Sequence, residues 1–312
     1  MTAPHDNNTI SAAAGKAAAL AVGFDACGIA RAAVLDDFSD SLSRWIATGR
    51  HAEMHFMEQY DTLRCNPAAM VDGAESVICL LAAYNPSQLM DTDGKVARYA
   101  YGEDYHERLK RMQYQMIAML KEQYPSFEGR PCVDSAPIAE KHWAVRAGLG
   151  WIGRNTLLVN PDYGSWVNLG EIVTSSVADQ YDNPMADGCG ECCRCVKACP
   201  NHALIADGQI DHHDAYMLDA RRCASYHTIE NPDDHLPDDI RLSGYIFGCD
   251  VCQLACPFNQ QAATRLEISD ERLQQLQSLA TCDAPTFKKI ARHSALRRIK
   301  FTQLQRNRGQ KQ

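Results

Sequence analysis

The sequence predicts a mixed α/β fold, of the α+β or α/β class, in three parts: a large first domain, a smaller cysteine-rich domain and a short helical C-terminal segment. Three observations lead to this prediction. Short apolar runs alternate with segments of helical spacing over the first 180 residues. Nine of the 14 cysteines lie between residues 189 and 256. From Lys288 to Lys311 the chain carries nine Lys or Arg residues and no acid.

Size and composition exclude several classes of protein. The chain has 312 residues, 46% of them apolar and 22% charged, which allows packed cores and excludes global disorder. No apolar run in the sequence reaches the roughly 18–20 residues that span a bilayer, so we expect no membrane contact. Residues 1–10 are polar and lack a basic start, so we expect no secretory signal. A cytoplasmic, reducing compartment follows, in which the cysteines remain thiols.

The first domain opens with alternating helices and strands. Residues 12–22 are rich in alanine and predict a helix, whereas the apolar runs 26–30 and 77–83 predict buried strands. Residues 36–47 and 103–123 have helical spacing. In the second of these helices one side is apolar and predicts a core face: Leu109, Met112, Met116, Met119 and Leu120.

Shorter elements complete this domain. A strand-like stretch at 131–133 precedes a helix over 137–147 that opens with proline, and strands at 156–159 and 166–177 flank a turn. Residues 181–188 form a polar linker with Pro and Gly. We therefore place the domains at 1–180, 181–262 and 263–312.

A glycine-rich stretch, Gly148-Leu-Gly150-Trp-Ile-Gly153, matches the dinucleotide fingerprint, with Glu171 18 residues further on. The fingerprint follows a strand and opens a helix. Here the glycines follow a predicted helix and lead into a predicted strand, which favours a tight loop without nucleotide binding.

The first cysteine motif is Cys189-x₂-Cys192-x₂-Cys195-x₃-Cys199-Pro200. This is the bacterial 4Fe–4S spacing, in which three thiolates bind one cluster and the fourth binds another. Zinc uses four ligands, usually as two separated pairs, and gives no reason for this pattern.

The second motif, Cys249-x₂-Cys252-x₃-Cys256-Pro257, lacks its first cysteine because Ile246 stands there. Cys223 is the nearest spare thiol. Two clusters then have four ligands each: Cys189, Cys192, Cys195 and Cys256 for the first, and Cys199, Cys223, Cys249 and Cys252 for the second. The sequence thus predicts a ferredoxin-like domain with two 4Fe–4S clusters, whose electrons serve the first domain. The other six cysteines are expected to be core residues or exposed thiols.

Asp134 is the candidate proton donor, because it follows a short strand and precedes a predicted helix. Burial would raise its pKa and the helix end would lower it. A general acid working near neutral pH needs the first effect to be larger. The alternative is an aspartate that only caps the helix.

Six segments together resemble the epoxyqueuosine reductase family, from about residue 10 to residue 307. They are RYAYGEDYH (98–106), VDSAPIAEK (133–141), AGLGWIGRN (147–155), GSW with LGEI (164–172), RCASYHTIE (222–230) and GCDVCQLACP (248–257).

The resemblance implies a cobalamin-dependent iron–sulfur oxidoreductase that performs the last step of queuosine biosynthesis, a step of tRNA processing. The family reduces the epoxide of the modified base at the wobble position of tRNA to a cyclopentene. In the implied mechanism cobalt(I) cobalamin attacks the epoxide, Asp134 donates a proton, and the two clusters pass on electrons from an external donor. The first domain is then the cobalamin-binding catalytic domain, and we expect a monomer.

The resemblance also suggests further site residues. Tyr105 and His106 are expected to approach the substrate or the cobalt, or else to be polar residues at a helix start. Arg98, Lys141, Arg154 and Asn155 are candidates for the corrin rim and the phosphate tail, although each also fits a surface position. Ser225 and Asp250 flank cluster ligands and are weaker cobalamin candidates, followed by Met57 and Ser165.

In this interpretation the C-terminal cations bind the tRNA. Arg297, Arg298, Lys300 and Arg306 are expected to neutralise phosphates of the tRNA anticodon stem-loop, with salt-sensitive affinity. The target base is unpaired in the loop and can enter a pocket. The alternative is a solvated helix end. Some family members continue into helical repeats, so we expect fewer tRNA contacts here.

Two other functions fit parts of the sequence. A reductive dehalogenase also joins cobalamin to two cubanes, but usually carries an export signal. A ferredoxin-type electron carrier would have the clusters without cobalamin, and would tolerate Asp134→Asn.

Overall fold

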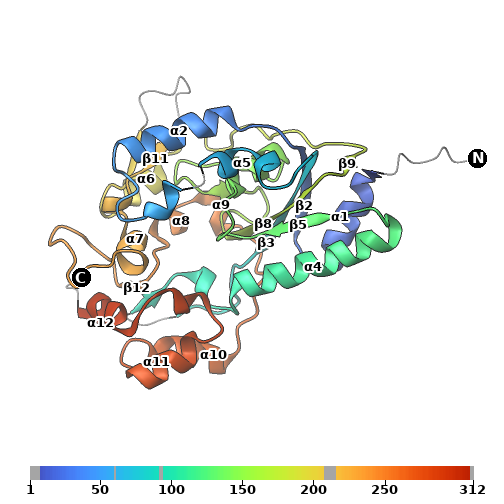
Figure 1. Ribbon diagram of the computed structural model, residues 1–312. Coiled ribbons are helices and arrows are strands. Elements are labelled where there is room, and N and C mark those ends of the chain that lie inside the picture. The colour runs from blue at the N-terminus through green and yellow to red at the C-terminus, as the bar shows by residue number, and fades with distance from the viewer. Residues whose placement is uncertain (1–7, 60, 91–93, 207–215, 310–312) are drawn as a thin grey trace, which may run out of the picture.

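A computed structural model describes residues 8–59, 61–90, 94–206 and 216–309 (Figure 1). The first domain is built around a four-stranded antiparallel sheet with strand order β2-β3-β8-β5. Its strands are β2 (Ala26–Arg31), β3 (Ser76–Ala83), β5 (Gly129–Cys132) and β8 (Val167–Thr174). Strand β3 is buried at every position. Its sequence is therefore a continuous apolar run, because both faces of the sheet are covered.

Helices cover the sheet on two sides, so the domain has three layers (Figure 1). Ile78 and Leu80 pack in one core with α1 (Ala12–Ala21) and α4 (Tyr105–Gln123). Val77 and Leu81 point to the other face and pack in a second core with α5 (Glu140–Arg146). The alternation follows from the two-residue period of a strand. Two short pairs lie beside the sheet: β1 (Thr9–Ile10) with β9 (Val177–Ala178), and β6 (Trp151–Ile152) with β7 (Leu158–Val159).

Helix α4 carries the predicted apolar stripe into the first core. Leu109, Met112, Met116 and Leu120 are buried, and Met119 is partly buried against them. Asp104 caps the helix by accepting a hydrogen bond from the His106 amide at 3.0 Å. The prediction of a core face on this helix is confirmed, and its capped end presents Tyr105 and His106.

The glycine-rich stretch forms the tight turn after α5 and then strand β6, which agrees with the predicted helix-to-strand loop. Gly148 and Gly150 have φ of +70° and +153°, in the region that side chains rarely adopt. A Cβ at Gly150 would lie 2.2 Å from the Val159 carbonyl oxygen. The chain continues into a strand and not a helix, so the stretch lacks the context of a dinucleotide site.

The segment between β2 and β3 folds over the second core. It contains α2 (Asp36–Ala47), the 3₁₀ turn η1 (His55–Met57), α3 (Asp61–Cys65) and η2 (Pro67–Ala69). Phe38, Leu63 and Cys65 pack into that core, which fixes the segment to the sheet.

The cysteine-rich part consists of short elements joined by loops. In chain order they are α6 (Arg194–Ala198), β10 (Leu204–Ala206), β11 (Tyr216–Leu218), η4 (Ala220–Arg222), α7 (Ala224–Ile229), β12 (Tyr245–Phe247), α8 (Val251–Leu254) and α9 (Pro257–Gln260). Strand β12 pairs in parallel with β4 (Lys95–Val96), which η3 (Arg98–Ala100) follows. This pairing joins the cysteine-rich part to the segment before α4.

The C-terminal segment is helical, as predicted, and it belongs to a core. Its elements are α10 (Asp270–Ser278), α11 (Ala284–Ala291), η5 (Ala295–Arg298) and α12 (Phe301–Gly309). Leu276, Leu296 and Leu304 are fully buried together with Ala100 and Phe247. The basic segment is therefore not a free arm. Lys311, its last cation, lies outside the described residues.

Within the described ranges, no helix combines the length and the apolar character that a membrane span requires.

Candidate functional site

A cavity of about 1600 Å³ opens between the first domain, the cysteine-rich part and the C-terminal segment. A second cavity of about 380 Å³ shares part of its wall. The residues that line both include Tyr105, Asp134, Glu140, Lys141 and Ser225. The larger one exceeds the ~300–1,000 Å³ of ordinary ligand pockets, and most of its wall is apolar.

Asp134 stands at the centre of a hydrogen-bonded group on the cavity wall. Its Oδ2 accepts a hydrogen bond from the Tyr105 hydroxyl at 2.5 Å and lies 2.7 Å from Nε2 of His106. The backbone at Asp134 has φ of +41°, a strained value for a residue with a side chain. The Asp134 amide donates to Oε1 of Glu140 at 2.5 Å. Tyr105 and His106 thus hold the carboxylate at the cavity wall, and Glu140 holds the backbone of Asp134.

The structure decides which effect sets the pKa of Asp134. Burial opposes its ionisation, but hydrogen bonds from His106 and Tyr105 outweigh burial and lower the pKa. Burial likewise opposes protonation of His106, while hydrogen bonds to Asp134 and Asp104 outweigh it and raise that pKa. Burial is thus not the larger effect at Asp134, and the effect that opposes it comes from the hydrogen bonds of His106 and Tyr105. Both shifts favour a proton on His106 and a charged carboxylate on Asp134.

The alternative of a capping aspartate is excluded. Helix α5 begins at Glu140, three residues later than predicted, and Ala139 occupies its N-cap position. Asp134 lies six residues before that helix begins and gives its carboxylate to Tyr105 and His106.

Asp104 supports the group from behind, and the sequence did not reveal this role. Its side chain is fully buried, and Oδ1 lies 2.7 Å from Nδ1 of His106. Its Oδ2 forms an ion pair with Nε of Arg297 at 2.8 Å. The imidazole of His106 is thus held between two carboxylates, which fixes the orientation of its ring.

Two buried glutamates near Asp134 were also missed. Burial and the charge of Asp134 raise the pKa of Glu140 to about 8. Glu171 on β8 is fully buried, and neither carboxylate oxygen has a hydrogen-bond partner among the described residues. Burial and the charge of Glu140 raise its pKa well above the usual value. A Glu inside an apolar strand, as in LGEI, is the sequence signal that could have identified the second of them.

The described cysteines are all free thiols, and the structure gathers eight of them into two groups. Burial, together with three neighbouring thiols, raises the pKa of Cys195 to about 11: Cys189, Cys256 and Cys192. Burial also raises the pKa of Cys252, again with three neighbours: Cys249, Cys223 and Cys199. These neighbourhoods match the two predicted ligand sets, including Cys223 in place of the missing cysteine. The donor sets suit two 4Fe–4S clusters.

N–H groups point at the sulfur atoms of both groups. The Trp151 indole lies 3.4 Å from Sγ of Cys189, and the Ala203 amide lies 3.3 Å from Sγ of Cys199. Hydrogen bonds to cluster sulfur tune the reduction potential. Cys193 belongs to neither predicted ligand set, and its Sγ accepts a hydrogen bond from the Arg154 guanidinium at 2.8 Å.

The candidate cobalamin contacts fall into two groups. Met57, Lys141, Asn155, Ser165, Ser225 and Asp250 line one or both cavities. Asn155 is buried, and its Nδ2 has no hydrogen-bond partner among the described residues. An unpaired amide donor in the mostly apolar wall of the smaller cavity, which shares wall residues with the larger one, suits the amide-rich rim of a corrin, so the residues present fit this cofactor.

The two arginines of this set are held by the protein. Arg98 donates to Oδ1 of Asn85 at 3.0 Å, and its guanidinium lies 4.4 Å from the centre of the Trp166 ring. Arg154 lines the larger cavity but donates to the backbone oxygens of Gly190 and Cys192, which orders the loop that carries the first cluster ligands.

Asp250, like the two arginines, connects segments of the fold. Its carboxylate accepts from the Arg98 amide at 2.8 Å, and burial raises its pKa to about 6. It therefore couples the segment before α4 to the helix that contains Cys252.

The four candidate tRNA contacts also differ from one another. Arg297 and Arg298 line the larger cavity, and Arg298 pairs with Glu230 at 2.6 Å. Lys300 is exposed beside them. Arg306, in contrast, donates to the backbone oxygens of Asn231 and His227, so its guanidinium joins α12 to the cysteine-rich part.

Comparison with known proteins gives one consistent family. The family model described as epoxyqueuosine reductase QueG, DUF1730 matches residues 64–135, and the 4Fe-4S double cluster binding domain matches residues 188–259. The chain is 39% identical over 300 residues to the epoxyqueuosine reductase of Cyclobacterium marinum, covering 94% of each.

Solved structures agree with this result. The chain resembles the epoxyqueuosine reductase from Streptococcus thermophilus with a TM-score of 0.82 and 27% identity, over 94% of this chain and 78% of that one. It also resembles an epoxyqueuosine reductase solved with an epoxyqueuosine-modified tRNA-Tyr stem loop, with a TM-score of 0.78 and 25% identity, over 93% and 77% of the two chains.

Proposed function

The chain belongs to the epoxyqueuosine reductase family, and from this premise we propose how its own residues carry out the reaction on tRNA. The enzyme reduces epoxyqueuosine to queuosine, which consumes two electrons and two protons and releases the epoxide oxygen as water. The observation that carries the assignment of roles is the contact of Asp134 with both His106 and Tyr105 on the wall of the large cavity.

Cobalamin, when bound, supplies a reduced cobalt nucleophile for opening the epoxide, and the two 4Fe–4S clusters supply single electrons. The chain holds the clusters with the two sets of thiols and offers the corrin the apolar cavity and the unpaired amide of Asn155. Asp250 and Ser225, which line the smaller cavity beside Cys223 and Cys252, belong to the path between cluster and corrin.

Proton delivery begins at His106. Its ring holds a proton at Nε2 that it shares with Oδ2 of Asp134. As negative charge develops on the epoxide oxygen, this proton passes from His106 through Asp134 to that oxygen, and His106 then takes up a proton from solvent, which supplies the second proton of the released water. Tyr105 keeps the carboxylate in place, and Asp104 stabilises the imidazolium. A carboxylate of low pKa acts as a donor here because a charged imidazole stands directly behind it.

The tRNA stem loop approaches over Arg297, Arg298 and Lys300. Two of these cations line the same cavity as Asp134, so a phosphate backbone bound there places an unpaired base next to Asp134. An external reductant supplies the electrons, the chain acts as a monomer, and the reaction takes place with the cytoplasmic pool of tRNA.

The test is anaerobic reconstitution with iron, sulfide and cobalamin, followed by incubation with tRNA that carries epoxyqueuosine. Mass spectrometry of the released nucleosides should show conversion to queuosine. Conversion that is unaffected in Asp134→Asn would refute the role given to this carboxylate. The alternative of a reductive dehalogenase would require turnover of halogenated organics by the same preparation, and an electron carrier would take up no corrinoid.

A further inference from the structure

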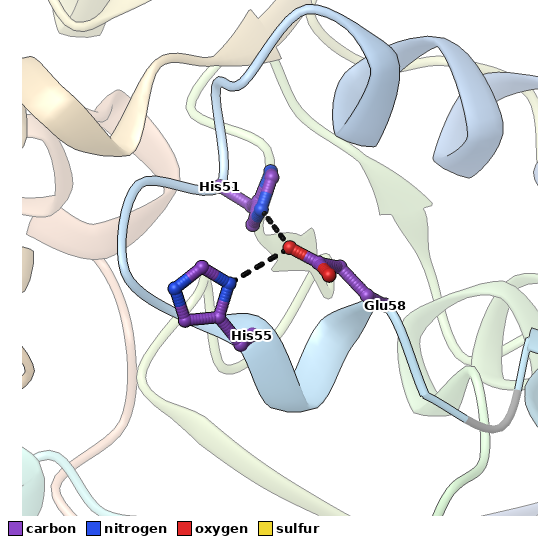
Figure 2. Close-up of side chains that lie close together, drawn as sticks. All are labelled: His51, His55 and Glu58. Atoms are coloured by element: carbon purple, nitrogen blue, oxygen red, sulfur yellow. Dashed lines mark hydrogen bonds and ion pairs between the residues drawn. The ribbon is translucent and has the colours of Figure 1, made fainter.

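A cluster of histidines and glutamates lies on the segment between α2 and α3, outside the groups used above. His51, His55 and Glu58 each offer one ligand atom, and these atoms lie within 4.8 Å of one another (Figure 2). In the part of the chain that the structure describes, this is the one such group of three or more His, Cys, Asp or Glu side chains. Neither the proposed proton transfer nor the cysteine groups involve it.

The three ligand atoms are close to the spacing of a metal site. Oε1 of Glu58 lies 2.7 Å from Nε2 of His51 and 2.9 Å from Nδ1 of His55. In a tetrahedral zinc site with bonds of ~2.0–2.1 Å, ligand atoms are about 3.3 Å apart. An outward shift of roughly half an ångström at exposed side chains would therefore make room for the ion.

A fourth side chain gives His55 the partner that metal-binding histidines usually have. The other ring nitrogen of His55, Nε2, lies 3.1 Å from Oε2 of Glu53. A neutral imidazole has one N–H, and donation to Glu53 leaves the Nδ1 lone pair facing the carboxylate of Glu58. In the protonated ring both nitrogens donate, so a metal ion at Nδ1 would take the place of the proton shared with Glu58 while Glu53 keeps the ring oriented.

One of the three side chains is buried and the other two are exposed, which suits a site that an ion enters from solvent. His51 is only 6% exposed and provides a fixed ligand, and its Nδ1 has no hydrogen-bond partner among the described residues. The side chains of His55 and Glu58 are 65% and 43% exposed, so an ion can enter from solvent and a water can complete its coordination.

The same segment forms part of the wall of the large cavity. Met54, Phe56 and Met57 line this cavity, and the Arg298 guanidinium lies 6.0 Å from the centre of the Phe56 ring. Along the chain, these three wall residues lie between the proposed ligands His51 and Glu58. An ion at this position would therefore fix the cavity wall without touching the reacting groups.

We propose that His51, His55 and Glu58 bind a divalent transition metal ion of the zinc type, with Glu53 orienting His55. Two imidazoles and one carboxylate suit zinc, whereas Mg²⁺ and Ca²⁺ prefer oxygen ligands. The bound ion ties the ends of the 51–58 segment together and stiffens one wall of the cavity.

The experiment uses tag-free protein with both clusters loaded, dialysed anaerobically against micromolar Zn²⁺, with zinc and iron measured together by mass spectrometry. We expect one zinc per chain at unchanged iron. His55→Ala and Glu58→Gln, both at exposed positions, should weaken zinc binding at least tenfold. Glu53→Gln should weaken it roughly tenfold, as loss of an outer partner does. His293→Ala, at another exposed histidine, is the matched control and should bind zinc like the unaltered chain.

Three results would overturn the proposal. The first is an unaltered chain that retains no zinc under these conditions. The second is equal retention of zinc by His55→Ala and Glu58→Gln, which would place the ion elsewhere. The third is uptake that rises only as iron is released, which would assign the zinc to the cluster thiols.

Discussion

Nε2 of His106 lies 2.7 Å from Oδ2 of Asp134, so the histidine can replace each proton that the aspartate gives away. The pKa of His106 is raised and that of Asp134 is lowered. Both shifts favour the charge pair of an imidazolium with a carboxylate. In the proposed mechanism, His106 holds the proton needed by the epoxide oxygen, and the Asp134 carboxylate lies between His106 and the cavity.

Asp134→Asn should leave the clusters and cofactor in place and slow a single turnover by about 10²–10⁴-fold, the usual contribution of a positioned acid. Stopped reactions analysed for queuosine, with absorption spectra of the loaded protein, measure both properties. Glu128→Gln removes an exposed carboxylate that pairs with Lys121 near the far end of helix α4 and is the control. A rate near that of the unaltered chain would eliminate Asp134 as the donor.

His106→Gln should change the pH dependence of the reaction. Because the pKa of His106 is raised above 6.5, the rate of the unaltered enzyme should fall as pH rises through that higher value. The variant should be slower and should lose this alkaline decline. A pH profile of single-turnover rates is the measurement.

His106→Gln should also change how the stability of the fold depends on pH. A raised folded-state pKa gives stability that is fully present below the unfolded value and is lost as pH rises through the folded one. The melting temperature of the unaltered chain should therefore decline more steeply above pH 6.5 than that of the variant. Equal slopes would show that the ion pair is absent in solution.

Cys223→Ala should lose about half of the iron, because it removes a ligand of one of two clusters. Iron and sulfide assays on reconstituted protein measure the loss. Cys282→Ala is the control, since its sulfur accepts a hydrogen bond from Arg308 and lies outside both thiol groups. Retention of all iron by the Cys223 variant would contradict the assignment of this ligand.

Arg298→Ala should weaken tRNA binding and make it less sensitive to salt. The log–log slope of affinity against salt should fall by about 0.7–0.9 for each phosphate that this arginine neutralises. Binding isotherms at several salt concentrations provide the slope. Lys121→Ala, in an exposed ion pair at the far end of α4, is the control. An unchanged slope would mean that Arg298 serves only to pair with Glu230.

The basic residues after Phe287 suggest truncation there as a test of tRNA binding, but the structure shows that this test is poor. It would remove Leu296 and Leu304, which are fully buried. Loss of a buried leucine typically costs about 2–5 kcal/mol, so the truncated chain would lose its fold along with its cations.

Glu171→Gln should raise stability at pH 7–8 by a few degrees in melting temperature and change little near pH 4.5. Burial raises the pKa of Glu171 well above its usual value, so the folded chain keeps it neutral while the unfolded chain ionises it. This cost grows as pH rises above the unfolded value, and glutamine removes it. Equal melting temperatures across this range would mean that the carboxylate is solvated.

The sequence by itself determined the features that depend on local spacing. The helix of residues 105–123 followed from its apolar period, and strand β3 followed from an unbroken apolar run. The two cysteine motifs, and the proposal that Cys223 joins the second of them, followed from counting thiols along the chain, and the fold places Cys223, Cys199 and Cys249 near Cys252. These features can be predicted because each is encoded within a short stretch of residues.

Tertiary structure alone decided the chemistry of Asp134 and the use of the basic segment. The pKa of Asp134 depends on His106 and Tyr105, which are 28 and 29 residues away and come from another element. Arg297 and Arg306 look alike in sequence, but one supports Asp104 and the other joins backbone carbonyls within the fold. Charge and burial depend on every neighbour in space, so no local pattern could distinguish them.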